Sequence, residues 1–416
     1  MSILGRQQQT LKRWGLNENP FRPTPPEDPE KLSRIFYGRE AEMEIALPAL
    51  YEGRNVLLRG AWGIGKTTLI LTLLNRLKQE VAELGEEMLI LYLGQVIGES
   101  PTDFYRALLL TLANALAAED EEAKAIADGI RGLSVQPEKI STEGKVNLWM
   151  FSLGVRQDSP TQQLSLANVD PYSLLIPLLD RAQTRYNRIV LAVDDLDKKD
   201  VPVVQDILEG SLDLFRRGEK RSFLITGRGF TDLQEATLRA LGIFSEDLSL
   251  EPMQPAELRQ IAINYLNLAR NTPRQDTYPF TDEVMERITQ YAQGTPRQLN
   301  IICEKVLRQA AQMNPEVIDL PAFEAIWQTV RQQVTYNLTP HLRRLLYVAY
   351  EAKGISEDIT DQYLDRIGVL TFVQLLPMLK ALEEQELLIR QETESGYRFV
   401  PSQLFLPEPE QRQEPG

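Results

Sequence analysis

The chain has 416 residues, of which 45 are Lys or Arg and 59 are Asp or Glu, giving a net charge of −14. This length predicts two to three domains. The acidity argues against a protein that coats nucleic acid by bulk charge, but it leaves room for a local basic groove.

The single histidine, His341, and the single cysteine, Cys303, exclude a Cys/His zinc site and an intrachain disulfide. No apolar run reaches the roughly 18–20 residues that cross a bilayer, and the N-terminus lacks the pattern of a secretory signal. We therefore expect a cytoplasmic protein with no membrane span and no zinc.

Residues 1–35 are expected to form an N-terminal strap. Five prolines fall between positions 20 and 29. Proline lacks an amide hydrogen and disfavours a helical residue before it, so we expect an extended segment that leads into the first domain.

Residues 36–254 alternate short apolar runs with amphipathic helices, which predicts an α/β domain with a parallel sheet. Runs of this length suit strands buried on both faces. The expected strands are 55–59, 88–93, 189–193, 222–226 and 247–250. The expected helices between them are 66–80, 102–118, 171–186 and 202–216.

One connection in this domain is unusually long. Residues 119–170 contain an acidic helix, expected at 119–129, and an alternating segment at 145–155 that predicts a hairpin or flap. Long insertions in compact domains are commonly functional or disordered, and the sequence leaves both open.

The rest of the chain predicts two smaller domains and a tail. Residues 255–334 contain helices only, and residues 335–405 contain three helices followed by a strand–turn–strand, the pattern of a winged helix. Residues 406–416 are polar and expected to be disordered. The helices are expected at 255–270, 282–293, 296–313, 320–334, 341–352, 357–367 and 372–388, and the strands at 388–391 and 397–400.

The strongest chemical signal is the segment from Gly60 to Thr67, which matches G-x-x-x-x-G-K-T between an expected strand and an expected helix. Its glycines let backbone amides curl round phosphates, and the helix N-terminus adds partial positive charge. We expect Lys66 to reach the β- and γ-phosphates of ATP and the Thr67 hydroxyl to ligate Mg²⁺. The nucleotide-binding residues expected here are Gly60, Gly63, Ile64, Gly65, Lys66, Thr67 and Thr68.

A second signal is the apolar run that ends in Asp194 and Asp195. Carboxylates at the carboxyl edge of a parallel sheet lie where ligands of such sheets bind. We expect Asp194 to hold Mg²⁺ through water and Asp195 to polarise the attacking water. The alternative is that both acids only cap the end of the strand.

Two arginines complete the candidate site. Arg228 follows the strand expected at 222–226 and is expected to touch the γ-phosphate; the alternative is a surface arginine. Arg297 lies in the first turn of the helix that Thr295 is expected to cap. A cation there is unfavourable for the helix dipole, which favours an anionic partner such as phosphate over a purely structural turn.

Taken together, these motifs resemble the AAA+ and STAND superfamily of P-loop ATPases, in the branch that contains origin-recognition-type, ExeA-type and STAND signalling ATPases. The segment from Trp14 to Phe21 resembles the opening of ExeA-type ATPases. The segment from Phe36 to Glu42 resembles the box that wraps the adenine in this branch, which implies that Gly38 and Arg39 also bind nucleotide.

The resemblance also implies roles for further residues, and at two positions the sequence departs from the usual family pattern. It implies that Arg228 and Arg297 are the two phosphate sensors, that residues 255–334 form the lid and that residues 335–405 form the winged helix. Asp195 stands where most AAA+ hydrolases have Glu, which implies slow hydrolysis, and Arg228 stands in place of Asn or Thr. Arg239 and the turn at 216–221 remain alternatives for an arginine finger.

The resemblance implies an ATP-hydrolysing switch that forms a homo-oligomer and engages a protein partner when it binds ATP and Mg²⁺. The alternative is an ATPase that acts on duplex DNA. Residues 336–400 carry seven basic and ten acidic side chains, so the expected winged helix is acidic, which disfavours strong phosphate binding.

Overall fold

The computed structural model describes residues 3–26, 28–94, 100–134, 169–194, 196, 201–216, 220–226, 241–336, 338–357, 363–369, 371–385, 387–393 and 396–402. The chain divides into two compact units. Unit 2 is the continuous stretch Glu27–Glu251, whereas unit 1 combines Met1–Pro26 with Pro252–Gly416. Among the described residues, no helix is both long enough and apolar enough to cross a membrane.

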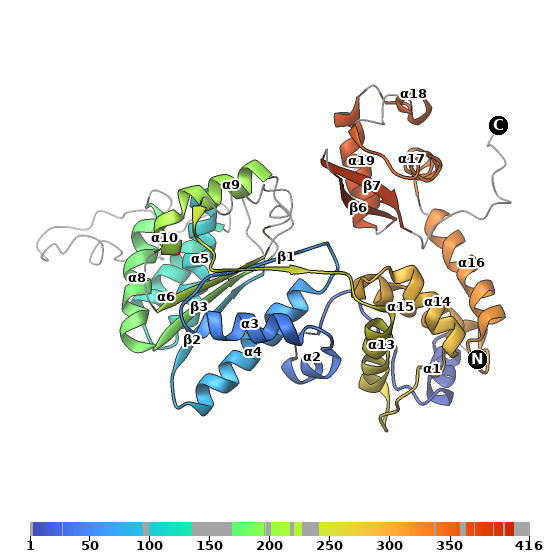
Figure 1. The fold of residues 1–416 in the computed structure, drawn as a ribbon, viewed down its shortest axis with the longest axis horizontal. Helices are drawn as coiled ribbons and strands as arrows, with labels where there is room; N and C mark the ends of the chain where they lie inside the picture. Colours follow the sequence, from blue (N-terminus) through green and yellow to red (C-terminus); the bar gives the residue numbers. More distant parts are fainter. Residues whose placement is uncertain are drawn as a thin grey trace, which may run out of the picture. The chain divides into compact units, whose positions relative to one another are not determined.

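Unit 2 contains a five-stranded parallel sheet in the order β2-β3-β4-β1-β5 (Figure 1). The strands are β1 (Val56–Gly60), β2 (Met88–Leu93), β3 (Arg188–Val193), β4 (Arg221–Thr226) and β5 (Glu246–Leu250). Because every pair is parallel, the carboxyl ends of β1, β3 and β4 meet at one edge of the sheet. This confirms the expected α/β fold with a parallel sheet, and each strand lies within one residue of its expected position.

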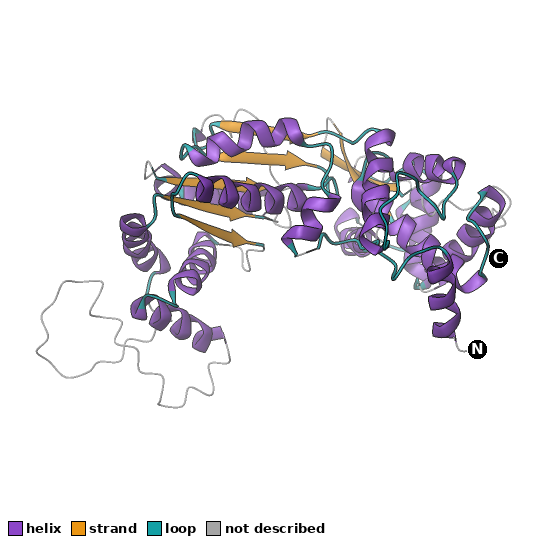
Figure 2. Ribbon diagram, turned by 90° about the horizontal axis from the view of Figure 1, so that it is seen from below, coloured by secondary structure: helices purple, strands orange, loops and turns teal. Residues whose placement is uncertain are grey.

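Helices cover both faces of the sheet (Figure 2). Successive residues of a strand point to opposite faces. Along β3, Val190 and Ala192 accordingly pack in one apolar core and Ile189, Leu191 and Val193 in the other. The first core includes α3 (Glu40–Tyr51) and α4 (Lys66–Glu83). The second includes α5 (Pro101–Leu116), α6 (Glu121–Ser134), α8 (Pro171–Arg185), α9 (Val201–Gly210) and α10 (Leu212–Arg216).

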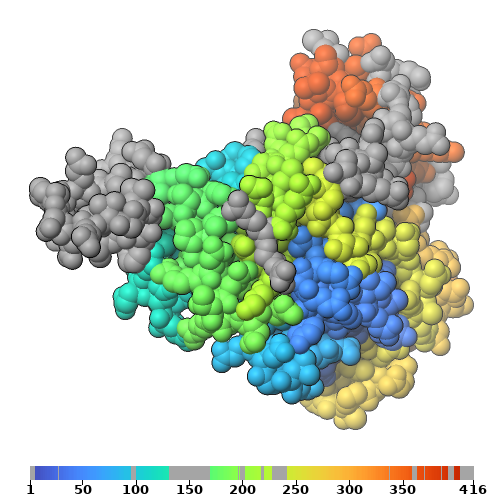
Figure 3. Space-filling view, turned by 60° about the vertical axis from the view of Figure 1, so that its left-hand side comes forward, coloured from blue at the N-terminus to red at the C-terminus, as the bar shows by residue number. Residues whose placement is uncertain are grey.

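Segments far apart in the sequence build this unit. In the space-filling view, blue atoms from early in the chain adjoin green and yellow-green atoms from much later in it (Figure 3). A buried amide joins the strands inside: Asn55 Nδ2 donates to Phe215 O at 3.1 Å and to Ile243 O at 3.0 Å, and Asn55 Oδ1 accepts from Phe223 N at 2.9 Å. Asn55 thereby fixes the start of β1 against β4 and the segment that enters β5.

The structure differs from expectation in three helices of unit 2. The helix expected at 202–216 is interrupted at the buried Ser211, and the acidic helix of the insertion runs to Ser134. Residues 29–35, expected as extended strap, form α2 (Pro29–Ile35), because Pro29 occupies the first helical position and Asp28 accepts a hydrogen bond from Glu30 N at 3.0 Å as the N-cap. The flap expected at 145–155 lies outside the described residues.

The N-terminal segment also differs from the expected strap, because residues 1–26 belong to unit 1. Helix α1 (Ile3–Arg13) packs on α15 (Pro296–Met313). Trp14 Nε1 donates to Glu316 O at 3.0 Å, and the Phe21 ring stacks on Tyr265 with 5.7 Å between centroids. Both aromatic side chains are 1% exposed, so the segment that resembles the ExeA-type opening is part of a core.

The helical part of unit 1 matches the expected helices closely. It consists of α13 (Pro255–Ala269), α14 (Asp282–Ala292), α15 and α16 (Leu320–Tyr336). Cys303 is fully buried in α15, as expected from its apolar neighbours, and burial raises the pKa of its thiol.

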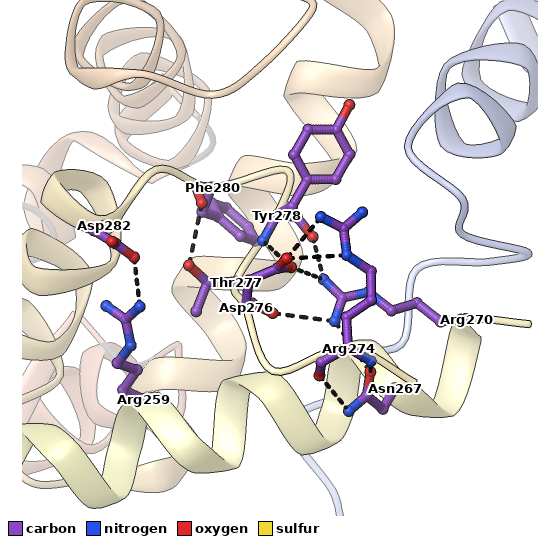
Figure 4. A network of polar contacts seen from close by, with 9 residues as sticks. All are labelled: Arg259, Asn267, Arg270, Arg274, Asp276, Thr277, Tyr278, Phe280 and Asp282. Carbon is purple, nitrogen blue, oxygen red and sulfur yellow. Dashed lines mark hydrogen bonds and ion pairs between the residues drawn. The ribbon is translucent and has the colours of Figure 1, made fainter. Parts of the chain in front are cut away.

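A polar network closes the loop between α13 and α14 (Figure 4). The buried Arg270 guanidinium donates to Asn267 Oδ1 at 3.0 Å, to Asp276 Oδ1 at 3.1 Å and to Tyr278 O at 2.6 Å. Arg274 donates to the other oxygen of Asp276 at 2.6 Å. Burial alone would raise the pKa of the Asp276 carboxyl, but the hydrogen bonds from Arg274 and the Tyr278 amide and the two positive charges outweigh it, so that pKa is lowered.

The last part of unit 1 contains α17 (Pro340–Glu351), α18 (Leu364–Ile367), α19 (Phe372–Glu384) and the antiparallel pair β6 (Leu388–Thr393) and β7 (Gly396–Pro401). Ile355 joins β7 through two backbone hydrogen bonds with Phe399, at 2.7 and 2.8 Å. Helices and hairpin thus form in the expected order, although the expected helix 357–367 is described only as the short α18. The winged-helix assignment stays a prediction, and the tail at 406–416 lies outside the described residues.

A candidate nucleotide site at the carboxyl edge of the sheet

The loop from Gly60 to Gly65 joins the end of β1 to the start of α4, as expected. Gly60, Gly63 and Gly65 have φ values of 151°, 78° and 105°, which side chains with a Cβ rarely adopt. A Cβ on Gly60 would also lie 3.0 Å from Ile64 Cγ2 and 3.1 Å from Leu250 Cβ. The glycines are therefore required by the backbone conformation, and the loop directs the N-terminus of α4 toward the sheet edge.

One side chain of this loop packs in the core, and that of Lys66, just after it, lies within the candidate site. Ile64 is 1% exposed and packs in the core shared by α3 and α4, which anchors the loop. Lys66 is 6% exposed, and its Nζ donates to Gly60 O at 2.8 Å and to Ala61 O at 3.3 Å. The ammonium group is thus held inside the loop, at the centre of the concave backbone that anions occupy in such loops.

Asp194 is the centre of a hydroxyl cluster. Its carboxylate is 1% exposed and accepts hydrogen bonds from Thr67 Oγ1 at 2.7 Å, Thr226 Oγ1 at 2.6 Å and Tyr92 Oη at 3.1 Å. These donors come from α4, the end of β4 and β2. A buried carboxylate needs such donors, because moving its charge out of water costs several kcal/mol. Each hydrogen bond that is missing costs roughly 1–3 kcal/mol or more.

Strand register explains why these four residues meet. Tyr92 and Leu224 pair with Ala192 from either side. Because side chains repeat every two residues, Asp194 and Thr226 lie one repeat beyond the pair Ala192 and Leu224, on the face covered by α4. The ends of the strands thus bring Tyr92, Asp194 and Thr226 to the same face, where Thr67 lies in the first turn of α4.

The donor set fits a Mg²⁺ ion. A hydroxyl that gives its hydrogen to Asp194 keeps its oxygen lone pairs for a metal, so Thr67 can serve both partners. Mg²⁺ prefers oxygen ligands and is usually held by one or two protein oxygens together with phosphate and water. Thr67 as a direct ligand and Asp194 as acceptor from metal-bound water would hold such an ion, which would offset the charge on ATP phosphates.

Gly38 and Arg39, implied as adenine contacts, lie just before α3. Gly38 has a φ of 79°, and its amide donates to Glu40 Oε1 at 3.3 Å. Arg39 forms an ion pair with Glu42 at 3.0 Å and donates to Glu251 O at 2.7 Å. The guanidinium therefore secures the residue at which unit 2 ends, and the role of both residues in nucleotide binding stays a prediction.

The segment from Gly294 to Arg297 lies in unit 1, at the start of α15. A Cβ on Gly294 would lie 2.5 Å from Pro252 Cβ, and Met253 N donates to Gly294 O at 2.9 Å. Thr295 occupies the N-cap position, but its side chain makes no capping hydrogen bond, contrary to expectation. The motif thus has a packing role in unit 1, and the sensor role of Arg297 stays a prediction.

Several sequence-predicted residues lie outside the described residues: Asp195, Arg228 and the finger candidate Arg239. Among the described residues, Thr226 is the β4 side chain that contacts Asp194, and Tyr92 is its contact from β2. Sequence reasoning missed both. Their positions could have indicated them, since each lies at or near the end of an expected strand. Their contact with Asp194, however, depends on the order of the strands in the sheet, which cannot be read from the sequence.

The chain is similar to a known protein family and to several solved structures. The chain matches the AAA ATPase domain family over residues 35–225. The solved structure of the Aeropyrum pernix ORC1 protein in complex with DNA is similar, with a TM-score of 0.51, 16% identity and coverage of 89% of this chain and 90% of that chain. No curated protein matches the chain.

Two further solved structures are similar over comparable lengths. The Aeropyrum pernix ORC2 protein in ADPNP–ADP complexes has a TM-score of 0.47 and 15% identity, covering 88% of this chain and 89% of that chain. The Thermotoga maritima RuvB Holliday junction branch migration motor has a TM-score of 0.43 and 16% identity, covering 88% and 93%.

Proposed function

Because the chain carries an AAA ATPase domain and is an ATPase, we propose that it acts as a switch whose Mg-ATP-bound form assembles into a homo-oligomer and engages a protein partner. The observation that carries this proposal is the hydrogen bond between Thr67 and Asp194, beside the enclosed Lys66. This hydrogen bond supports a site in which the residues that would bind phosphate and metal are in direct contact with the end of β3.

In this proposal, each residue of the site has one task. Lys66 leaves the carbonyl oxygens of its own loop to pair with the β- and γ-phosphates, and the glycine-rich backbone donates to the phosphate oxygens. Thr67 and Asp194 hold Mg²⁺, which neutralises charge on the phosphates. Asp195 polarises the attacking water, and its short side chain makes hydrolysis slow, so the ATP-bound form persists.

Arg297 supports the switch part of the proposal because it is a cation in the first turn of α15, where the helix dipole favours an anionic partner such as phosphate. We assign Arg297 as the second phosphate sensor and Arg228 as the first. In the proposal, these sensors make the conformation of the protein depend on the bound nucleotide, which couples nucleotide state to assembly.

An ATPase that acts on duplex DNA is the second candidate, and the similar ORC1 structure is a complex with DNA. The basic residues of the expected winged helix weigh against it. Arg398 donates to Ala352 O at 2.7 Å, and Arg343 donates to Tyr336 O at 3.3 Å. Arg390 pairs with Glu383 at 3.3 Å and stacks over Phe399. These guanidinium groups are engaged inside the domain rather than presented to phosphate.

The experiment is ATP-dependent assembly of an Arg297→Ala variant. We expect it to bind ATP as the wild type does but to lose assembly, since the sensor and not the binding loop is changed. Arg308→Ala is the matched control, because Arg308 lies on the same helix with an exposed side chain. Normal assembly of the Arg297 variant, or ATPase activity stimulated by duplex DNA at about 0.1 M salt, would contradict the proposed switch.

A further inference from the structure

We propose that Tyr92 is a positioning residue for Mg²⁺: its hydroxyl fixes the Asp194 carboxylate in the orientation that binds metal-held water. This inference rests on the proposed role of Asp194 in holding the ion. It adds a third strand, β2, to the machinery of a site that otherwise draws on α4, β3 and β4.

The geometry assigns one direction to this contact. An ionised carboxylate only accepts hydrogen bonds, so the phenol is the donor to Asp194 Oδ2 at 3.1 Å. Thr67 donates to the same oxygen at 2.7 Å, and Thr226 donates to the other at 2.6 Å. Within the part of the chain that the structure describes, these three donors hold both oxygens of the carboxylate and so fix its plane and its rotation.

Thr67 cannot perform this task alone, because in the proposed site it is also a metal ligand whose position depends on the ion. Thr226 holds only Oδ1, about which the carboxylate can still turn. Tyr92 is not a metal ligand in the proposed site, so its hydroxyl can hold Oδ2 in place whether or not the metal is bound. Groups that orient metal-binding residues in this way typically change metal affinity by about 10- to 100-fold when removed.

The Tyr92 ring is itself held. A Cβ on Gly94 would lie 3.2 Å from Tyr92 Cε1 and 3.5 Å from Tyr92 Oη, so the absence of a side chain at Gly94 gives the ring its place. The Tyr92 side chain packs in this space while the residue remains 37% exposed. Tyr92→Phe therefore removes the hydroxyl group and retains the ring, and the variant is expected to fold normally.

The test measures Mg²⁺ affinity without turnover. Binding of a fluorescent N-methylanthraniloyl derivative of ATP is first measured in EDTA. In a second sample that contains protein, the same nucleotide and no chelator, MgCl₂ is titrated and the fluorescence change gives the Mg²⁺ concentration at half-effect. For Tyr92→Phe we expect the Mg²⁺ concentration at half-effect to rise by about tenfold, with nucleotide affinity in EDTA unchanged within about twofold. A change in Mg²⁺ affinity without a change in nucleotide affinity distinguishes a positioning role of Tyr92 from general damage to the site.

Tyr51→Phe is the matched control, because Tyr51 donates to the Glu86 carboxylate in the same unit and also at 3.1 Å. It should leave both affinities unchanged. A Mg²⁺ half-point for Tyr92→Phe within twofold of wild type, or equal weakening with and without Mg²⁺, would overturn the role of Tyr92. A wild-type protein whose nucleotide binding ignores Mg²⁺ would overturn the proposed function as well.

Discussion

Thr67 Oγ1 donates to Asp194 Oδ2 at 2.7 Å, which joins the first turn of α4 to the end of β3. The two residues are 127 positions apart in the sequence. Their contact brings the glycine-rich loop and the acidic strand end together, and Thr226 and Tyr92 also donate to the carboxylate. The predictions below start from this cluster.

Replacing Lys66 by Ala should abolish binding of ATP or weaken it by more than about 100-fold, because a buried ammonium group in a phosphate loop has no substitute. Equilibrium dialysis with labelled ATP measures this. Lys78→Ala is the control, since Lys78 is an exposed lysine of the same helix. Wild-type affinity in the Lys66 variant would show that the loop does not bind the nucleotide.

Thr226→Val should lower stability by about 1–3 kcal/mol, because the nearly isosteric change removes a donor from the buried Asp194 carboxylate. It should also slow ATP hydrolysis. Urea unfolding and a phosphate-release assay measure the two effects. Thr72→Val, which removes a hydroxyl that donates to Thr68 O in α4, should leave hydrolysis near wild type. Equal hydrolysis rates in all three proteins would exclude a role for Thr226.

Asp276→Asn should destabilise unit 1 at pH 7 but not at low pH. The pKa of the Asp276 carboxyl is lowered in the folded protein, so its charge contributes stability above the unfolded pKa of about 3.9, and this contribution is lost as the pH falls below that value. The difference in melting temperature between wild type and variant should therefore shrink from pH 5 to pH 3.

The control for this series is Asp282→Asn, whose exposed carboxylate pairs with Arg259 at the surface. Surface pairs contribute little, about 0–1 kcal/mol, so the melting temperature should change less. A difference between wild type and Asp276→Asn that stays constant from pH 7 to pH 3 would contradict the network around Arg270.

Much of the fold could be predicted because its signals are local. A buried parallel strand is an unbroken apolar run, and β2 and β3 are found within one residue of their expected positions. The signal of the glycine-rich loop is equally local, since its glycines, Lys66 and Thr67 fall within eight consecutive residues. Asp194 was found because an acid at the end of such a strand is itself a local pattern.

What could not be predicted depends on contacts between distant segments. Tyr92 and Thr226 reach Asp194 only because β2 and β4 flank β3 in this register. Trp14 and Phe21 were interpreted as part of a strap, yet their burial depends on Glu316 and Tyr265, which lie far along the chain. Composition and spacing do not encode such partners directly.

The most direct test of the proposed switch is light scattering of Asp195→Asn with and without Mg-ATP, each with and without duplex DNA. This variant should bind ATP without hydrolysing it and so remain in the ATP-bound form. We expect an increase in molar mass to that of an oligomer with Mg-ATP alone. A protein that stays monomeric with Mg-ATP and assembles only when duplex DNA is added would contradict the proposed function.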